Sequence, residues 1–342
     1  MRGVPLVHAS ALAPFGQFLG EIGAPIHRLF AQVGLPEDAL AEPDALVPMH
    51  QIGVLTDRVA RAEGLEHLGF LICQRMPVVG MGPFGRLVAG SSSLHEALHT
   101  AVRLHPAYAS GGRLGLAVEN QKVWLRHTQD RRLQLGWQWI EQFNVLLMIQ
   151  LVRLTSHRNW RPREVQLRVP RGVGLDKIEA LADARISFGH GSTSIEIPRA
   201  LLGEPLAGNK LSARVREEVE QGLLRTAPAA DFSGSVRQVV ATLLRDGYPS
   251  VQRTSGAIGL SARTLQRRLG ENGVSYSRIV EEERFRVAAE LITQSRLRIT
   301  DVAMELGYTD PTTFTHAFHR WTGLSPSQYR RHEVGTARRS AR

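Results

Sequence analysis

The sequence predicts an α+β N-terminal domain followed by an all-α C-terminal domain that contains two helix-turn-helix motifs joined by a long helix. Three observations lead to this prediction. A two-segment unit occurs twice, at Val251–Leu269 and Ile299–Phe318. One long helical pattern, Tyr276–Gln294, separates the copies. Short strand-like runs appear only in the first 200 or so residues, among helical segments, as in α+β domains.

The first hundred residues are expected to be mainly helical. Apolar residues recur with helical spacing in Pro25–Val33, His50–Glu63 and Leu94–Leu104. Proline and glycine residues separate these segments.

Strands are expected after this helical part. Leu114–Val118 and Val123–His127 flank Asn120-Gln121, which predicts a β-hairpin. Further strand segments are expected within Glu164–Val169 and Ile186–Ile197.

A strongly apolar helix, Trp137–Arg153, is expected between the hairpin and the later strands. Its aromatic residues Trp137, Trp139 and Phe143 are interpreted as core or dimer contacts in preference to a ligand cage.

The character of the chain changes after residue 206. Lys210–Leu224 is compatible with a short charged helix, and Thr226–Ala230 with a linker. The expected division is therefore a domain at residues 10–206, a linker at 207–231, a second domain at 232–334 and a basic tail at 335–342.

The two repeated units match position by position. Apolar or small residues of the first unit have counterparts in the second, and Gly259 and Gly307 stand where the first helix must stop and turn. This is the pattern of a helix-turn-helix. The matched pairs are Val251 and Ile299, Ser255 and Ala303, Ile258 and Leu306, Leu265 and Phe314, Leu269 and Phe318.

Capping residues support these helices. Ser261 precedes the second helix of the first unit, and Asp310-Pro311 begins that of the second. Ser325 and Gln328 form a capping box. The connecting helix Tyr276–Gln294 would be roughly 28 Å long, close to the roughly 34 Å between successive major grooves on one side of DNA.

These motifs resemble the DNA-binding domain of the AraC/XylS family of bacterial transcription regulators. The resemblance covers residues 232 to about 332 and is most specific over Asp301–Arg330. It departs from the family at Thr254-Ser255, where a Val-Ala pair is usual, so a buried hydroxyl there would need a partner. The resemblance implies sequence-specific binding of double-stranded DNA, regulation of transcription as an activator or a repressor, and contact with RNA polymerase.

The N-terminal part resembles the effector and dimerisation domain of a subset of this family that includes ornithine-utilisation regulators. The resemblance covers about residues 10–206 and rests on Gly80–Val102 and Ile186–Leu206. It implies a homodimer that responds to a small organic effector, such as an amino acid or related metabolite. It assigns no residue to the effector site.

The family's base-reading positions fall on Arg263, Gln266 and Arg267 in the first unit, and on Thr312, Thr315 and His316 in the second. In each triplet the helical spacing places the residues opposite the apolar stripe. Arg can bind guanine through two hydrogen bonds and Gln can bind adenine, so the first helix is expected to discriminate bases more strongly. Phosphate contacts are expected from Ser261, Arg268 and Arg320.

Composition is consistent with these expectations. The net charge is +10, and from residue 206 onward 21 Lys or Arg and 14 Asp or Glu give +7 of it. Cys73 is the only cysteine, which fits a reducing cytoplasm and excludes a Cys-based zinc site. Neither a signal peptide nor a membrane span is expected. No cofactor is expected.

Two alternatives stay open. His95-Glu96-Ala97-Leu98-His99 matches the motif of zinc hydrolases, with His105 as a possible third ligand. The preferred interpretation is an amphipathic helix with surface histidines, no metal site and no catalytic residue, because Val102 stands where the longer motif needs glycine. The second alternative is an architectural DNA-binding protein that responds to no ligand.

Overall fold

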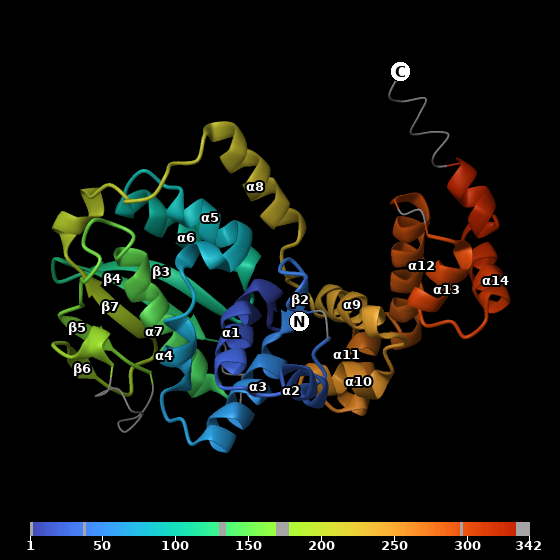
Figure 1. Ribbon diagram of the computed structural model, residues 1–342, viewed down its shortest axis with the longest axis horizontal. Helices are drawn as coiled ribbons and strands as arrows, with labels where there is room; N and C mark the ends of the chain where they lie inside the picture. The colour runs from blue at the N-terminus through green and yellow to red at the C-terminus, as the bar shows by residue number, and fades with distance from the viewer. Residues whose placement is uncertain (1–2, 37–38, 130–134, 169–177, 295–296, 333–342) are drawn as a thin grey trace. The chain divides into compact units, whose positions relative to one another are not determined.

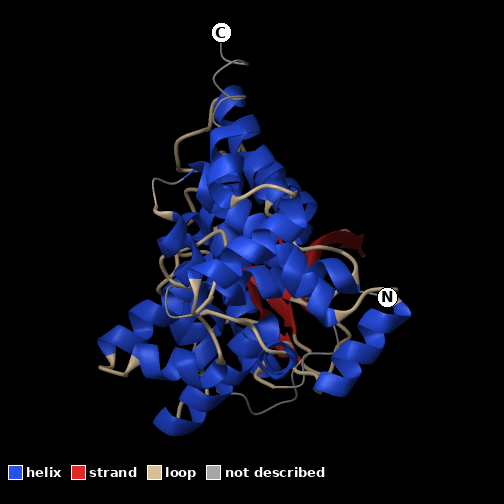
Figure 2. Cartoon of the chain, turned by 90° about the vertical axis from the view of Figure 1, so that its right-hand side faces the viewer, coloured by secondary structure: helices blue, strands red, loops and turns tan. Residues whose placement is uncertain are grey.

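The computed structural model describes residues 3–36, 39–129, 135–168, 178–294 and 297–332. The chain divides into two compact units, residues 2–230 and residues 231–342 (Figure 1). All the strands belong to the first unit, and the second unit is helical over the residues described (Figure 2). The predicted combination of an α+β domain and an all-α domain is confirmed.

The N-terminal unit is mostly helical up to residue 108. Short 3₁₀ turns link several of its helices. Its α-helices are α1 (Ala13–Glu21), α2 (Ile26–Val33), α3 (Met49–Glu63), α4 (Leu68–Cys73), α5 (Gly82–Ala89), α6 (Leu94–Tyr108), α7 (Trp137–Val152) and α8 (Ala213–Arg225).

A five-stranded sheet in the order β3-β4-β7-β5-β6 supports these helices. All neighbouring pairs are antiparallel except β5 and β6, which are parallel. A separate antiparallel pair joins β1 (Leu6–His8) to β2 (Leu46–Pro48). The strands of the larger sheet are β3 (Gly112–Glu119), β4 (Lys122–Gln129), β5 (Glu164–Gln166), β6 (Arg185–Ser187) and β7 (Thr193–Ile197).

The predicted hairpin is the start of this sheet. Glu119 pairs with Lys122, so only Asn120 and Gln121 form the turn between β3 and β4. Both turn residues have positive φ, 49° and 65°. Two successive left-handed residues match the right-handed twist of the flanking strands, and asparagine tolerates this conformation better than most residues.

One face of β4 is buried under helices. Val123, Leu125 and His127 alternate along the strand and are all buried, as a sheet with one covered face requires. Helix α6 packs against β3, and α7 packs against β7. The main hydrophobic core of the unit therefore lies between the sheet and the helices.

Helix α8 belongs to the N-terminal unit. The side chain of Leu223 is fully buried, Arg216 Nη2 donates to the Gly90 carbonyl (3.0 Å), and Arg103 Nη2 donates to Glu220 (2.9 Å). The charged helix expected in the segment 207–231 thus exists, and it packs on the surface of α5 and α6.

The C-terminal unit contains both repeated motifs. In each, the first and second helices form the turn predicted from the sequence, with Gly259 (φ 69°) and Gly307 (φ 71°) in the left-handed region. Residues 326–332 form a last helical segment. The helices are α9 (Phe232–Leu243), α10 (Val251–Ala257), α11 (Ala262–Glu271), α12 (Tyr276–Gln294), α13 (Ile299–Glu305) and α14 (Pro311–Thr322).

Small residues allow the helices of each motif to approach closely. Ser255 on α10 and Ala303 on α13 are both buried, as are the stripe residues Leu265, Leu269, Phe314 and Phe318. The expected capping bonds are present: Ser261 Oγ accepts from Thr264 N (3.2 Å), and Asp310 accepts from Thr312 N and Thr313 N (3.1 and 2.8 Å).

The unusual Thr254-Ser255 pair has hydrogen-bond partners. The Tyr276 hydroxyl donates to the Pro249 carbonyl (2.6 Å), which leaves its oxygen to accept from the Thr254 hydroxyl (2.6 Å). Ser255 Oγ donates to the Gln252 carbonyl (3.1 Å). Both buried hydroxyls are therefore satisfied, and the first bond network ties α10 to the start of α12.

Helix α12 has the bounds that the sequence predicts, and Ile279, Ala288 and Ile292 are fully buried. Glu283 is charged but buried, and its carboxylate accepts from Arg286 Nε (2.8 Å). Its burial arises because α12 packs against both α9 and α13, so more than one face is covered.

Replacing Tyr276 with Phe should lower the free energy of unfolding by about 1–3 kcal/mol, because the buried Thr254 hydroxyl and Pro249 carbonyl lose their partner. Chemical denaturation of the full chain measures this. The matched control is Tyr248→Phe, whose side chain is 54% exposed, with an expected change within about 0.5 kcal/mol. Equal effects of the two substitutions would contradict the role assigned to the network.

Candidate DNA-binding surface

The second helix of the first motif presents a polar face to solvent. Arg263, Gln266 and Arg267 are all exposed, whereas Leu265 and Leu269 on the opposite side of α11 are fully buried. The apolar stripe thus packs α11 against the rest of the unit, and the long hydrogen-bonding side chains on the opposite face are accessible to a binding partner.

The second helix of the second motif follows the same plan with shorter side chains. Thr312 and His316 are exposed and Thr315 is half-buried, opposite the buried Phe314 and Phe318. Thr315 Oγ1 donates to the Pro311 carbonyl (3.0 Å), so its proton is used within the helix. A methyl group and acceptor lone pairs are what Thr315 offers to a partner.

Three arginines near these faces contact a neighbouring side chain. Arg267 pairs with Glu271 one turn later on α11. The Arg268 guanidinium lies over the Phe232 ring, 5.6 Å from its centroid. Arg320 Nη2 lies 3.7 Å from Glu281 Oε1. The ion pairs of Arg267 and Arg320 are exposed, so replacing the glutamate partner with another anion changes the free energy little. Arg268 is instead held against the Phe232 ring.

Arg284 joins the second motif to the segment that precedes the first. From the middle of α12 its guanidinium lies 3.7 Å from the ring centroid of Tyr308, beside the turn of the second motif. It lies 5.4 Å from the ring centroid of Tyr248, which follows α9, and Nη2 donates to the Leu306 carbonyl (3.0 Å). Burial lowers the pKa of Arg284, and the nearby Tyr308 and Tyr248 hydroxyl groups oppose that shift.

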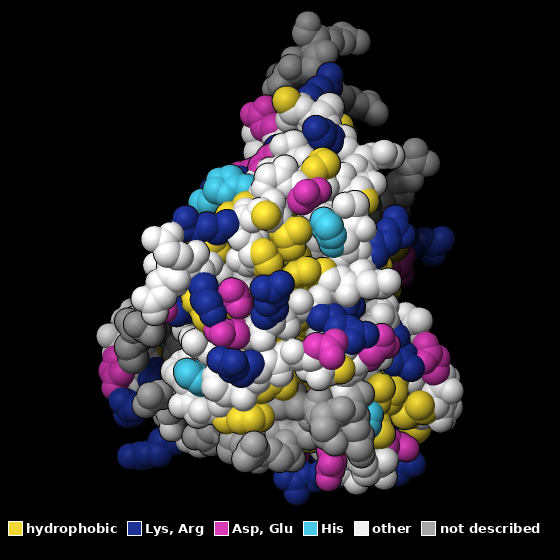
Figure 3. All heavy atoms as spheres, turned by 90° about the vertical axis from the view of Figure 1, so that its left-hand side faces the viewer, with side chains coloured by type: hydrophobic (Ala, Val, Ile, Leu, Met, Phe, Trp, Pro, Cys, Tyr) yellow, Lys and Arg dark blue, Asp and Glu magenta, His cyan; other side chains and the backbone are white. Residues whose placement is uncertain are grey.

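The arginine-rich composition does not make the whole surface basic. On the face drawn in Figure 3, Lys and Arg side chains are interspersed with Asp and Glu. In the N-terminal unit Arg75 pairs with Glu21 (2.6 Å), and Arg161 pairs with Asp183 (2.8 Å) and Glu179 (2.7 Å). Composition alone therefore does not locate the interface, and the exposed residues of α11 and α14 are the better guide.

The His-Glu-x-x-His match forms the start of α6. His95 and His99 are exposed with their ring centroids 4.3 Å apart, as surface histidines one turn apart would be. Glu96 Oε2 accepts from Ser92 N (2.7 Å), Oε1 lies 3.3 Å from Arg216 Nη2, and the bonds from Ser92 lower the Glu96 pKa. Glu96 therefore holds the residue before the Ser93 cap of α6 and pairs with Arg216 of α8.

His105 does not join the other two histidines. It lines an internal cavity of the N-terminal unit, and its Nδ1 atom is buried. Within the described ranges no group of three or more His, Cys, Asp or Glu side chains is arranged to hold a metal ion. None of the helices in those ranges is both long and apolar enough to cross a membrane.

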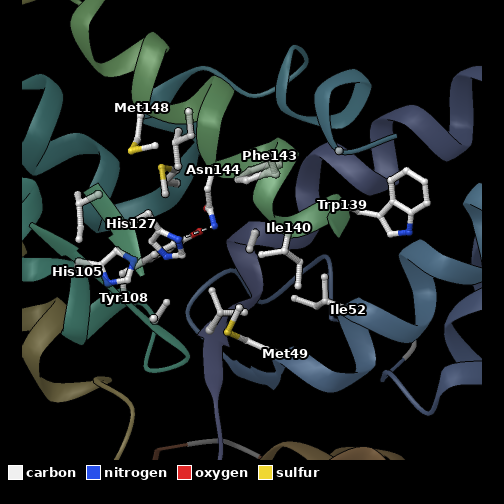
Figure 4. A pocket seen from close by; sticks show the side chains of 18 of the residues that line it. Met49, Ile52, His105, Tyr108, His127, Trp139, Ile140, Phe143, Asn144 and Met148 are labelled. Atoms are coloured by element: carbon white, nitrogen blue, oxygen red, sulfur yellow. Dashed lines mark hydrogen bonds between the residues drawn. The ribbon is translucent and has the colours of Figure 1, made fainter. Parts of the chain in front are cut away.

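The cavity that His105 lines also contains Tyr108, His127 and Asn144, none of which the sequence singled out for ligand binding (Figure 4). Trp139 and Phe143, expected as core or dimer contacts, line the same cavity. The polar Asn144 lies one residue after Phe143 in a helix that is apolar over most of its length, and this was a signal that sequence analysis could have used. Trp137 lies apart from it under the Arg168 guanidinium, 5.7 Å from the ring centroid.

Comparison with known proteins gives two family matches. Residues 23–206 match the model of the arabinose-binding domain of AraC transcription regulators, N-terminal, and residues 255–332 match a helix-turn-helix domain.

Similar proteins cover most of the chain. The ornithine utilization regulator of Pseudomonas aeruginosa is 23% identical over 96% of this chain and 96% of its own length. VirS of Mycobacterium tuberculosis, a helix-turn-helix transcriptional regulator, is 22% identical over 95% of this chain and 96% of its own. The crystal structure of the transcriptional regulator CdpR from P. aeruginosa is 20% identical, covers 94% of this chain and 98% of its own, and has a TM-score of 0.43.

Purified protein should contain no stoichiometric zinc, because His105 does not lie with His95 and His99. Glu96→Gln should lower the free energy of unfolding by about 0.5–1.5 kcal/mol, because the bonds from Ser92 and the ion pair with Arg216 lose the carboxylate charge. The control is His95→Ala combined with His99→Ala, which should change it little. Elemental analysis and thermal unfolding measure these outcomes. Chelator-sensitive hydrolysis that Glu96→Gln abolishes would contradict the structural role of Glu96.

Proposed function

This chain belongs to the AraC transcription regulators that carry an N-terminal arabinose-binding domain, and we propose that effector binding in that domain controls how a homodimer contacts DNA. The chain is a DNA-binding transcription regulator with two helix-turn-helix motifs, and it is not an enzyme. The observation that supports the proposed mechanism best is the pair of exposed polar faces on α11 and α14, each backed by a buried stripe.

In the proposed complex α11 reads bases through Arg263, Gln266 and Arg267. Arg forms two hydrogen bonds with the major-groove edge of guanine, and Gln does so with adenine. Arg267 must leave Glu271 to do this, and an exposed ion pair on one helix contributes only about 0.3–0.5 kcal/mol. Exchanging the Glu271 carboxylate for DNA as the partner of Arg267 therefore requires little free energy.

Helix α14 would contribute weaker readout through Thr312, Thr315 and His316. The methyl group of a threonine can contact the thymine methyl, and His316 is exposed on the same face. Ser261, Arg268 and Arg320 are proposed to contact phosphates, which set the position of each helix without reading sequence. The Phe232 contact of Arg268 would hold its guanidinium in one place for this purpose.

The division of labour follows the two units. We propose residues 10–206 as the effector and dimerisation domain, 207–231 as the connection that includes α8, and 232–334 as the DNA-binding domain. The tail at residues 335–342 lies outside the residues that the structure describes. Contact with RNA polymerase, activation of transcription and a cytoplasmic location are proposed with this mechanism.

Arg267→Ala should cost about 1–3 kcal/mol on the specific DNA site and relax its sequence preference, because one base contact is lost. Arg320→Ala, the matched phosphate variant, should weaken all DNA sequences similarly and reduce the salt dependence by about one unit of slope. Titrations with specific and random DNA at several salt concentrations separate the two. Unchanged affinities for both DNAs in Arg267→Ala would show that α11 is not in the groove.

Fragments should divide the activities. Residues 231–342 should bind DNA alone but more weakly than the full chain, because a dimer that engages two sites can gain about 10²–10⁴ in apparent affinity. Residues 1–230 should dimerise and bind the effector. Size, DNA affinity and effector binding are measured for both fragments and the full chain. An effector response in residues 231–342 would contradict this division of labour, and no effector response in the full chain would favour an architectural DNA-binding protein.

A further inference from the structure

The N-terminal unit encloses a cavity of about 100 Å³ among α6, α7, β3, β4 and the segments at the start of the chain (Figure 4). Its walls are mostly apolar side chains and contain three methionines, Met49, Met81 and Met148. The remaining apolar walls come from residues that include Val7, Phe15, Ile52, Phe84, Ile140, Phe143, Leu147 and Leu151.

Most of the polar groups of the cavity lie together, although Thr56 and the Trp139 indole also line it. Asn144 Nδ2 donates to His127 Nδ1 (3.2 Å), and the rings of His127 and His105 have centroids 5.7 Å apart. Figure 4 shows these side chains and Tyr108 gathered on one side, away from Ile52 and Ile140. His105 Nδ1 is buried and has no hydrogen-bond partner among the described residues. A buried polar atom without a partner points to a ligand group or water that completes its bonding.

No charged side chain faces the cavity. Among the described residues that line it there is no Asp, Glu, Lys or Arg. Burial lowers the pKa of His105 to about 4. Burial, with the nearby His105 and Arg168, lowers that of His127 to about 3. Both imidazoles are therefore neutral near neutral pH, and the nearest ion pair, Glu141 with Arg168, lies outside the lining.

We propose that this cavity is the effector site and that it takes a compact, neutral, mainly apolar molecule with one hydrogen-bonding group, such as a hydroxyl or carbonyl. The statement that this molecule is an effector rests on the proposed function. The ligand class is argued from the cavity lining alone and does not depend on that function. The hydrogen-bonding group would lie at His105, with the apolar remainder against the methionine and phenylalanine side chains.

Size and charge together exclude other classes. An apolar cavity of about 150 Å³ holds a benzene ring, so this one accepts about a single ring or a short branched chain. An amino acid such as ornithine would bury ammonium and carboxylate groups with no opposite charge to meet them. A sugar would bury several hydroxyl groups where only three or four side chains can bond them. The amino-acid class expected from sequence resemblance is therefore not the class that this cavity favours.

Calorimetric titration of the full chain with phenol, cyclohexanone and benzene tests the proposal, with L-ornithine and L-arabinose as the charged and polyhydroxy probes. At least one neutral probe should bind with a dissociation constant below about 1 mM, and the last two should show no saturable binding up to roughly 10 mM. Because the cavity walls are generic and apolar, failure of all three neutral probes overturns the proposal.

Leu147→Trp fills the cavity and should weaken binding of the neutral probes at least about tenfold. The matched control is Leu154→Trp, another half-buried leucine two turns later in the chain that does not line the cavity. Asn144→Leu, which removes the partner of His127, should weaken phenol more than benzene and serves if Leu147→Trp does not fold. Equal affinity of Leu147→Trp and the wild-type protein for the neutral probes would show that they do not bind in this cavity.

Specific DNA affinity is measured on the same samples. Intact DNA binding without binding of any neutral probe refutes the cavity proposal and leaves the proposed function standing. Binding of a neutral probe without specific DNA binding supports the cavity proposal and refutes the proposed function. Binding of L-ornithine or L-arabinose that Leu147→Trp abolishes would identify the cavity as an effector site but overturn the ligand class.

Discussion

The C-terminal unit depends on a single guanidinium placed between the second motif and the segment that leads into the first. Arg284 contacts the Tyr308 ring and the Leu306 carbonyl of the second motif and faces Tyr248, which lies between α9 and the first motif. Gly307 reinforces this junction, since a Cβ there would lie 3.0 Å from Tyr248 N. A partly desolvated cation over aromatic rings is stronger than an exposed one. Because α12 is the only covalent connection between the motifs, this contact limits how the two DNA-facing helices can rotate about it.

The DNA-facing helices show how stability and recognition are separated. The stripe residues Leu265, Leu269, Phe314 and Phe318 are buried, so the packing of α11 and α14 does not use their exposed residues. The polar side chains on the other face can consequently differ in their contacts with DNA without affecting the packing of the helices. Their ion pairs are exposed and weak, which lets the same side chains exchange a carboxylate for a phosphate or a base without unfolding anything.

The N-terminal unit buries polar side chains in several places. The buried Glu141 accepts from the Thr193 hydroxyl (2.5 Å), and Asn144, His127 and His105 meet at the cavity. Helix α6 serves two purposes: Glu96 in its first turn pairs with Arg216 of α8, and its end supplies His105 and Tyr108 to the cavity. Since α8 immediately precedes the C-terminal unit in the chain, α6 provides a physical connection from the cavity to the segment that leads to the DNA-binding helices.

The sequence by itself determined the elements whose causes are local. The repeated units, the two-residue hairpin turn and the bounds of α12 follow from apolar period, capping residues and turn residues that lie within a few positions of one another. The buried Ser255 hydroxyl also follows a local rule, since it donates to the Gln252 carbonyl three residues earlier. Only the tertiary structure decided that Tyr276 binds the Thr254 hydroxyl, that Glu283 is buried, and that Arg284 contacts the second motif. The same is true of Trp139 and Phe143, which face a cavity with His105 and His127. These features bring together residues from distant parts of the chain, and the period of one helix shows which face is apolar but not which neighbour covers that face or how completely it is filled.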